Sequence, residues 1–132
     1  MAYSYRIDLE LGVVQAELIG VLDDEAFIAL FTEVLHHPDY RVGMKSLLDF
    51  RRVTQFDLTG QGIRTLAGMV VSRLNSHAVP WQTALVAPQD VAYGLSRMYQ
   101  ILREGSMSQV EVFREFSEAW RWLGLPEDEI PA

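Results

Sequence analysis

Residues 46–63 read SLLDFRRVTQFDLTGQGI, and this stretch predicts the fold class of the chain. It begins with a short apolar strand at 46–50 that includes a carboxylate near its end. The more polar residues 51–57 are predicted to form a connection. A helix then begins near Thr59 and packs through Ile63 and apolar residues at helical spacing after it. A buried strand followed at once by a helix is typical of an α/β domain.

The same alternation continues on the C-terminal side. The run 84–87, Ala-Leu-Val-Ala, is apolar on both faces, as in a central parallel strand. A helix is predicted from about Gln89, and its inward-facing residues are Val91, Leu95, Met98 and Leu102. A last strand at 109–113 and a last helix ending at Gly124 follow; that helix carries Phe116, Ala119, Trp120 and Leu123.

Two strands and a helix precede the central stretch. Apolar and polar residues alternate over 3–10 and again over 14–18, which predicts an antiparallel hairpin with one wet face, closed by Gly20. Asp23 or Asp24 caps the following helix. The expected order is therefore ββαβαβαβα, an α/β fold with a mixed, mostly parallel sheet and an N-terminal hairpin. Residues 1–125 form a single domain and 126–132 a frayed, acidic C-terminal tail.

Composition excludes several classes of function. The net charge is −7, and the single lysine and ten arginines are scattered along the chain, so a nucleic-acid-binding groove is not expected. The longest stretch without a charge, 74–89, is too short and too polar to span a membrane. The chain has no cysteine, and its first ten residues do not form a signal peptide. We therefore expect a cytoplasmic protein.

No catalytic constellation is evident. Gly60 and Gly62 lie at a helix start, but neither a third glycine at the dinucleotide spacing nor a Gly-Lys-Ser/Thr follows. No serine lies in a Gly-x-Ser-x-Gly turn. His36, His37 and His77 are expected at a helix end and in a loop, where metal binding is the less favoured interpretation. The sequence therefore predicts no enzyme, no cofactor and no metal site.

Two carboxylates and one aromatic residue remain as candidates. Asp49 and Asp57 are expected near the carboxyl edge of the sheet, where they would form an acidic site for a cation or for acid–base chemistry. The favoured alternative is structural: Asp57 caps the helix, and Asp49 pairs with Arg51 or Arg52. Trp122 lies off the apolar stripe of its helix, which indicates an edge, a pocket or an interface.

The segment 47–60, LLDFRRVTQFDLTG, followed by Gln-Gly-Ile, resembles the central motif of STAS domains, the anti-sigma-factor antagonist modules also called SpoIIAA-like. Asp49 matches the strand-end aspartate of the motif, and Asp57 the aspartate before the phosphoacceptor turn. Thr59 matches the hydroxyl residue that regulatory members present to a kinase, and Gly60 matches the glycine after it. Leu58 stands where the family usually has a hydroxyl residue.

The C-terminal stretches 92–99, 112–114 and 119–124 look like a divergent branch of uncharacterised bacterial SpoIIAA-like proteins. The resemblance implies a SpoIIAA-like (STAS) fold and a non-enzymatic regulatory module. It would dock a protein partner, a kinase or an anti-sigma-type regulator, around Asp57, Thr59 and Gly60. The favoured alternative for Thr59 is structural: its hydroxyl caps the helix that begins there.

Two further expectations concern ligands and assembly. The alternative function is a lipid- or small-ligand-binding module, whose apolar pocket would include Met69, Met98 and Tyr99. A homodimer is also expected, because the first strand is a candidate sheet edge that carries the aromatic residues Tyr3 and Tyr5.

Overall fold

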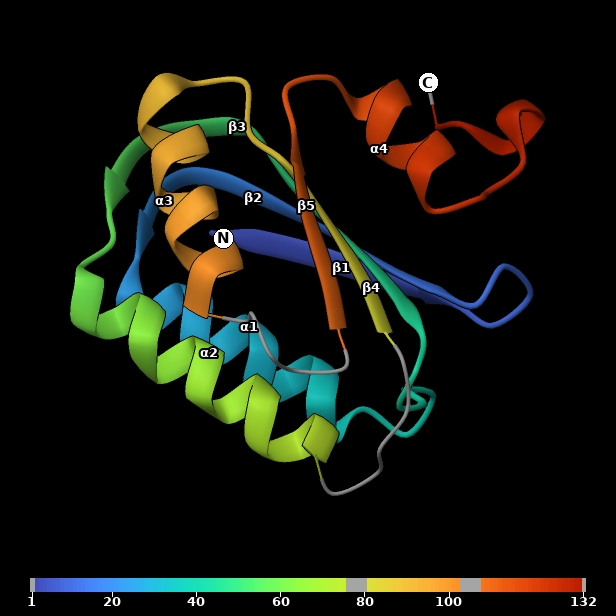
Figure 1. Ribbon diagram of the computed structural model, residues 1–132, viewed down its shortest axis with the longest axis horizontal. Helices are drawn as coiled ribbons and strands as arrows, with labels where there is room; N and C mark the ends of the chain where they lie inside the picture. Colours follow the sequence, from blue (N-terminus) through green and yellow to red (C-terminus); the bar gives the residue numbers. More distant parts are fainter. Residues whose placement is uncertain (1, 76–80, 103–107, 132) are drawn as a thin grey trace.

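The computed structural model describes residues 2–75, 81–102 and 108–131. Within these residues five strands form one sheet in the order β1-β2-β3-β4-β5 (Figure 1). The strands are β1 (Tyr3–Asp8), β2 (Val13–Asp23), β3 (Lys45–Asp57), β4 (Trp81–Val86) and β5 (Ser108–Phe113). The helices are α1 (Asp24–His36), α2 (Gly60–Asn75), α3 (Asp90–Leu102), α4 (Phe116–Trp122) and the 3₁₀ turn η1 (Glu127–Glu129).

The predicted topology is confirmed. β1 pairs with β2 in antiparallel fashion, and every other neighbouring pair is parallel. Leu47–Asp49 of β3 lie directly beside Ala84–Val86 of β4. Because the spatial order of the strands follows the chain order, crossovers of one hand carry successive helices to the same face of the sheet. Figure 1 shows α1, α2 and α3 together on one side, with α4 apart from them.

Strand alternation builds a core on each face. In β3, Leu48 packs into the large core beneath α1, α2 and α3, whereas Leu47 packs into a smaller core beneath α4. In β2, Val14 and Val13 divide in the same way. Since successive side chains of a strand point to opposite faces, one strand serves both cores.

β3 is longer than predicted. The connection expected at 51–57 is extended and continues to pair with β2, beyond the end of β4. Its ladder with β2 has two register shifts, in each of which β3 contributes one extra residue. Gly20 lies inside β2 at the second shift, with φ +73°, and therefore does not close the hairpin as predicted. The polar residues of 51–57 show no apolar pattern from which a strand could be predicted. This half of β3 pairs with β2 alone.

The predicted inward stripe of α3 was correct only in part. Leu95 and Met98 are partly buried against the core, but Val91 is 60% exposed. The residues fully buried in the core are Ala92, Ser96 and Tyr99. These three have the same i, i+4, i+7 spacing as the predicted stripe, so periodicity alone did not distinguish the two sets. The small side chains of Ala92 and Ser96 allow α3 to lie close to the sheet.

The C-terminal segment is packed rather than frayed. Trp120 is fully buried, and its indole N–H donates to the carbonyl oxygen of Pro126 at 2.7 Å. Gly124 ends the helical region at φ +74°, the left-handed conformation that glycine adopts most easily. Leu125 is buried, and Ile130 packs against the same core. Residues 125–130 therefore extend the cover that α4 provides.

Candidate functional site

The turn between β3 and α2 is centred on Thr59, which is exposed. The Thr59 hydroxyl donates to Oδ2 of Asp24 at 2.5 Å, and the Thr59 backbone N–H donates to Oδ1 of the same carboxylate at 2.9 Å. The hydroxyl oxygen also accepts from the backbone N–H of Gly62 at 3.0 Å. Thr59 thus caps α2, as its position before a helix predicts, and also joins α2 to the first residue of α1.

This joint requires glycine at position 62. A Cβ atom placed there would lie 2.1 Å from Oδ1 of Asp24, far inside van der Waals contact. Gly60, the glycine of the predicted motif, is less constrained, since its nearest neighbour would be Cε of Met98 at 3.4 Å. The sequence pattern indicated Asp24 only as a candidate cap for α1, and its contact with Thr59 has no local signal along the chain. In fact Asp23 caps α1, accepting from the N–H of Ala26 at 2.8 Å.

The structure does not bring Asp49 and Asp57 together. They are eight positions apart in one extended strand, a separation of about 25 Å at about 3.3 Å per residue. Asp57 accepts from the side-chain amide of Gln55 at 3.0 and 3.3 Å and does not cap the helix, which was the structural role considered for it. Asp49 and Asp57 therefore do not form the shared acidic site expected from the sequence.

Asp49 lies on the α4 side of the sheet and has a structural role. Its carboxylate is buried and accepts from Nε and Nη2 of Arg51 at 3.0 and 2.8 Å, as the structural alternative predicted. The guanidinium also lies 4.5 Å from the ring centre of Phe116. Hydrogen bonding to Asp49 raises the pKa of Arg51. The ion pair therefore satisfies the buried carboxylate, while the Arg51 side chain remains half-exposed.

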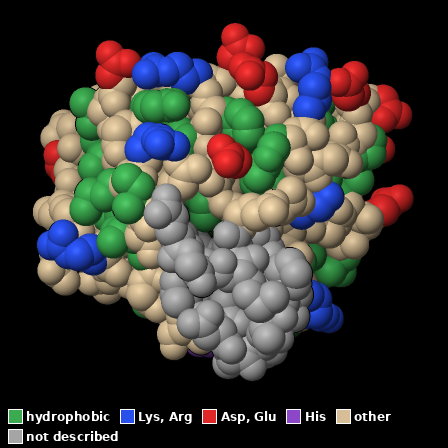
Figure 2. All heavy atoms as spheres, viewed as in Figure 1, with side chains coloured by type: hydrophobic (Ala, Val, Ile, Leu, Met, Phe, Trp, Pro, Cys, Tyr) green, Lys and Arg blue, Asp and Glu red, His purple; other side chains and the backbone are tan. Residues whose placement is uncertain are grey.

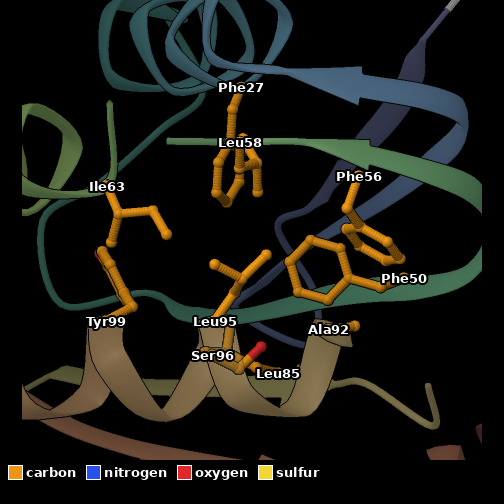
Figure 3. Close-up of a pocket in the computed structure, with 10 residues that line it drawn as sticks. All are labelled: Phe27, Phe50, Phe56, Leu58, Ile63, Leu85, Ala92, Leu95, Ser96 and Tyr99. Atoms are coloured by element: carbon orange, nitrogen blue, oxygen red, sulfur yellow. The ribbon is translucent and has the colours of Figure 1, made fainter. Parts of the chain in front are cut away.

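An apolar cavity lies beneath the Thr59 turn (Figure 3). Its volume is about 20 Å³, which is space for about one water molecule. Side chains from α1, β3, α2, β4 and α3 converge on it; they are Phe27, Phe50, Phe56, Leu58, Ile63, Leu85, Ala92, Leu95, Ser96 and Tyr99. Of the three pocket residues named from the sequence, Tyr99 lines the cavity and the two methionines do not. Leu58 and Ile63 connect it to the turn.

The remaining candidates are separate from this turn. His36 bonds to the carbonyl oxygen of Thr32 at 2.8 Å, while the ring of His37 meets that of Tyr5 edge-on. His77 lies outside the described residues. In the part of the chain that the structure describes, no three His, Asp or Glu side chains are grouped closely enough to hold a metal ion. Trp122 is half-buried against Phe113, with ring centres 5.7 Å apart.

Comparisons with known proteins address the fold. No family model matches the sequence, and no curated protein matches it significantly. Among solved structures, an uncharacterised protein of the DUF3478 family from Shewanella loihica PV-4, described as having a SpoIIAA-like fold, matches with a TM-score of 0.57. The match covers 92% of this chain and 94% of that one at 11% identity. None of the described helices is both long and apolar enough to cross a membrane. The chain has a SpoIIAA-like α/β fold, as the motif around Thr59 predicted.

Proposed function

We propose that this protein is a non-enzymatic regulatory module that docks a protein partner through the turn at Asp57, Thr59 and Gly60 and the start of α2. The observation that carries the proposal is the bonding of Thr59. Its exposed hydroxyl donates to Asp24 and accepts from Gly62, so one side chain joins the N-termini of two helices. The proposal includes a cytoplasmic setting and a partner of the kinase or anti-sigma-regulator type.

The electrostatics of the turn explain how such a site would respond to modification. A phosphate on Thr59 would add nearly two negative charges at the N-terminus of α2, where the helix dipole favours an anion. The carboxylate of Asp24 already occupies that position, 2.5 Å from the hydroxyl oxygen. Two anions would not share this position, so modification would separate Asp24 from the turn. The surface presented by α1 and α2 would change while the sheet stayed intact.

The test uses Thr59→Asp together with Thr59→Asn as its matched control. Both side chains cap a helix well and have nearly the same shape, but only aspartate adds a charge. The partner is first identified by a photo-cross-linker placed at position 59, with the same cross-linker at Leu9 as a background control. We expect Thr59→Asp to change the partner's dissociation constant at least tenfold and Thr59→Asn to change it little.

Unfolding experiments test whether Thr59→Asp acts through repulsion of Asp24. If it does, Thr59→Asp should lower the free energy of unfolding, and the double variant with Asp24→Asn should recover most of that loss. Equal affinity of the parent, Thr59→Asp and Thr59→Asn for the cross-linked partner would refute the proposal. In that case Thr59 is only a helix cap.

The apolar cavity supports a second candidate function, the binding of a small apolar ligand or lipid. Its lining is almost wholly apolar, with Ser96 as the polar exception. A volume of about 20 Å³ means that any larger ligand must displace side chains such as Leu95. Titration with benzene, followed by NMR, should shift the methyl signals of Ile63 and Leu85 if this function holds. Ser96→Leu, which fills the cavity, should abolish those shifts, and their absence in the parent protein would exclude this alternative.

A homodimer through β1 completes the proposal. β1 is an edge strand, so one side of its backbone is unpaired within the sheet. Tyr3 and Tyr5 are partly buried against the helix-covered core, with Tyr5 edge-on to the ring of His37. Burial raises the pKa of Tyr3, and its hydrogen bond to Glu33 raises it further. Pairing would therefore rest on the backbone. Light scattering should give about twice the 15.0 kDa of the chain, and Tyr5→Pro, which removes a backbone donor, should reduce it to the monomer.

A further inference from the structure

A polar hollow lies on the face of the sheet that α4 covers only in part (Figure 1). Its volume is about 250 Å³, a little below the range of about 300–1,000 Å³ typical of ligand pockets. Strands β1, β2 and β3 form its floor, and α4 and the C-terminal segment border it. Its polar lining residues are Ser4, Arg6, Gln15, Glu17, Asp49 and Arg51. The polar hollow is therefore large enough for a small molecule.

Two rows of side chains cross the floor of the polar hollow, because paired residues of neighbouring strands point to the same face. In the first row, Arg6 lies beside Gln15, and Gln15 lies beside Leu47. The second row consists of Ser4, Glu17 and Asp49. The sheet thus brings polar residues of three strands to one place, and the pattern within a single strand does not reveal this.

Arg51 is held in place at the polar hollow. Its Nε and Nη2 donate to Asp49 at 3.0 and 2.8 Å, and its guanidinium lies 4.5 Å from the ring centre of Phe116. Asp49 thereby occupies the side-on pair of N–H groups. The end-on pair, one N–H on each terminal nitrogen, bonds to none of the described residues, and the side chain is 50% exposed. This end-on pair matches the geometry of a second carboxylate.

Two further donors lie in the first row. Nε2 of Gln15 is shielded from water, and no acceptor among the described residues lies within hydrogen-bonding distance of it. A buried donor without a partner is unfavourable, and an acceptor supplied by a ligand removes that cost. Arg6, beside Gln15, is 65% exposed and has a carboxylate oxygen of Asp8 only at 3.9 Å. The uncommitted groups of the polar hollow are therefore mainly donors.

Net charge does not select the ligand, because two arginines and two carboxylates line the polar hollow. On the face of the molecule shown in Figure 2, Lys and Arg side chains are likewise interspersed with Asp and Glu. Both carboxylates of the polar hollow already accept from an arginine; the pairs are Asp49 with Arg51 and Glu17 with Arg52. A cation would have to compete with these arginines, whereas an anion finds donors that are not in use.

We infer that the polar hollow binds a small carboxylic acid. The carboxylate of the ligand accepts from the end-on pair of Arg51, and the amide of Gln15 supplies a further donor. The apolar part of the ligand contacts Phe116 and Pro131, which border the same hollow. This site lies on the opposite face of the sheet from the Thr59 turn, so it does not depend on the proposed function.

The test titrates the full chain with three planar probes of nearly the same shape. Benzoate is an anion, benzamide is neutral and benzamidine is a cation. We expect benzoate to shift the amide NMR signals of residues 15–17 and 49–51 and to bind at least tenfold more tightly than benzamidine. The titration extends to about 20 mM, because so small a probe binds weakly. Absence of these shifts with benzoate, or equally tight binding of benzamidine at the same residues, would overturn the inference.

Two matched variants test the role of Arg51. Arg51→Lys keeps the positive charge but removes the pair of N–H groups that a carboxylate requires. Arg114→Lys is the control, because Arg114 is 49% exposed, donates to Asp90 at 3.0 Å and lies 4.4 Å from the ring centre of Tyr93. We expect Arg51→Lys to weaken benzoate binding at least tenfold and Arg114→Lys to change it less than twofold. Equal effects of the two variants would overturn the inference.

A second pair of variants decides the matter if Arg51→Lys unfolds the protein. Gln15→Glu replaces the amide donor by an anion of nearly the same shape, and Gln61→Glu adds the same charge at the exposed start of α2. We expect Gln15→Glu to abolish benzoate binding and Gln61→Glu to leave it unchanged within twofold. Benzoate binding by Gln15→Glu as tight as that of the parent protein would overturn the inference.

Discussion

The two faces of the sheet are built from the same strands but are covered to very different extents. Beneath α1, α2 and α3, alternate residues of the strands join one continuous apolar core. On the other face only the part beneath α4 is apolar, around Val13, Leu47 and Ala84. The part formed by β1, β2 and the middle of β3 is polar and carries a hollow of about 250 Å³, bordered by Arg6, Gln15, Glu17, Asp49 and Arg51, with Phe116 at its margin.

This difference follows from the connections. Three parallel crossovers place their helices on one face, and only the C-terminal segment returns to the other. The polar half is the wet face that the alternation in the N-terminal strands predicted. The Thr59 turn and the apolar cavity both belong to the helix-covered side. The proposed interaction site therefore lies where helix N-termini meet, whereas the opposite face holds the ion pairs Arg51–Asp49 and Arg52–Glu17.

The largest expected effect is on the thinly covered face. Trp120→Ala should lower the free energy of unfolding by about 3–5 kcal/mol, because a fully buried indole is the centre of the small core. Trp120→Phe keeps a ring but removes the hydrogen bond to Pro126, and should lower the free energy of unfolding by less than Trp120→Ala does. Urea unfolding of the two variants measures both losses. A loss below about 1 kcal/mol for Trp120→Ala would mean that α4 does not stabilise the domain.

Leu85→Ala tests the helix-covered face. Leu85 is 2% exposed in β4 and borders the apolar cavity, so the deletion enlarges an existing void. We expect a loss of about 2–5 kcal/mol, as for buried leucines in general. Leu47→Ala, in β3 and directed toward the other core, is the matched comparison. If Leu85→Ala costs less than about 1 kcal/mol, β4 is not a central strand.

Gly62→Ala tests the joint between α1 and α2. The added methyl group would overlap the Asp24 carboxylate, and we expect a loss of about 1–3 kcal/mol. In an Asp24→Ala background the same change should cost little, because the obstructing group is gone. Gly68→Ala is the control: it lies in the same helix with no atom within 4 Å of the added Cβ, and should stabilise the protein by up to about 1 kcal/mol. If Gly62→Ala lowers the free energy of unfolding equally in both backgrounds, the contact between Asp24 and the Thr59 turn is not what requires glycine at position 62.

The smallest effect is expected on the polar half of the sheet. Arg52 donates to Glu17 at 2.8 Å, but the two side chains are 65% and 35% exposed. Water screens such pairs, so Arg52→Ala should change stability by less than about 1 kcal/mol. Thermal unfolding at low and high salt measures this. A larger loss of stability that also depends on the salt concentration would show that this ion pair contributes more to stability than its exposure indicates.

The sequence alone determined the order of the elements and the pairing of the strands. Residues 84–87 are apolar on both faces, which suffices to predict a central parallel strand, and the alternation in 3–10 predicts a half-wet hairpin. The capping of α2 by Thr59 was also predictable, because the hydroxyl bonds to an N–H only three residues away. These features depend on neighbours along the chain, and such neighbours are visible in the sequence.

Tertiary structure decided the details of the site. Residues 51–57 form a strand because they pair with β2. α3 buries Ala92, Ser96 and Tyr99 most deeply, because the first two are small enough to let the helix approach the sheet. Asp24 joins Thr59 across 35 positions, so no local pattern could identify it or explain Gly62. Periodicity records which residues are apolar, but which of two adjacent apolar stripes is buried depends on the shape and packing of the surface opposite.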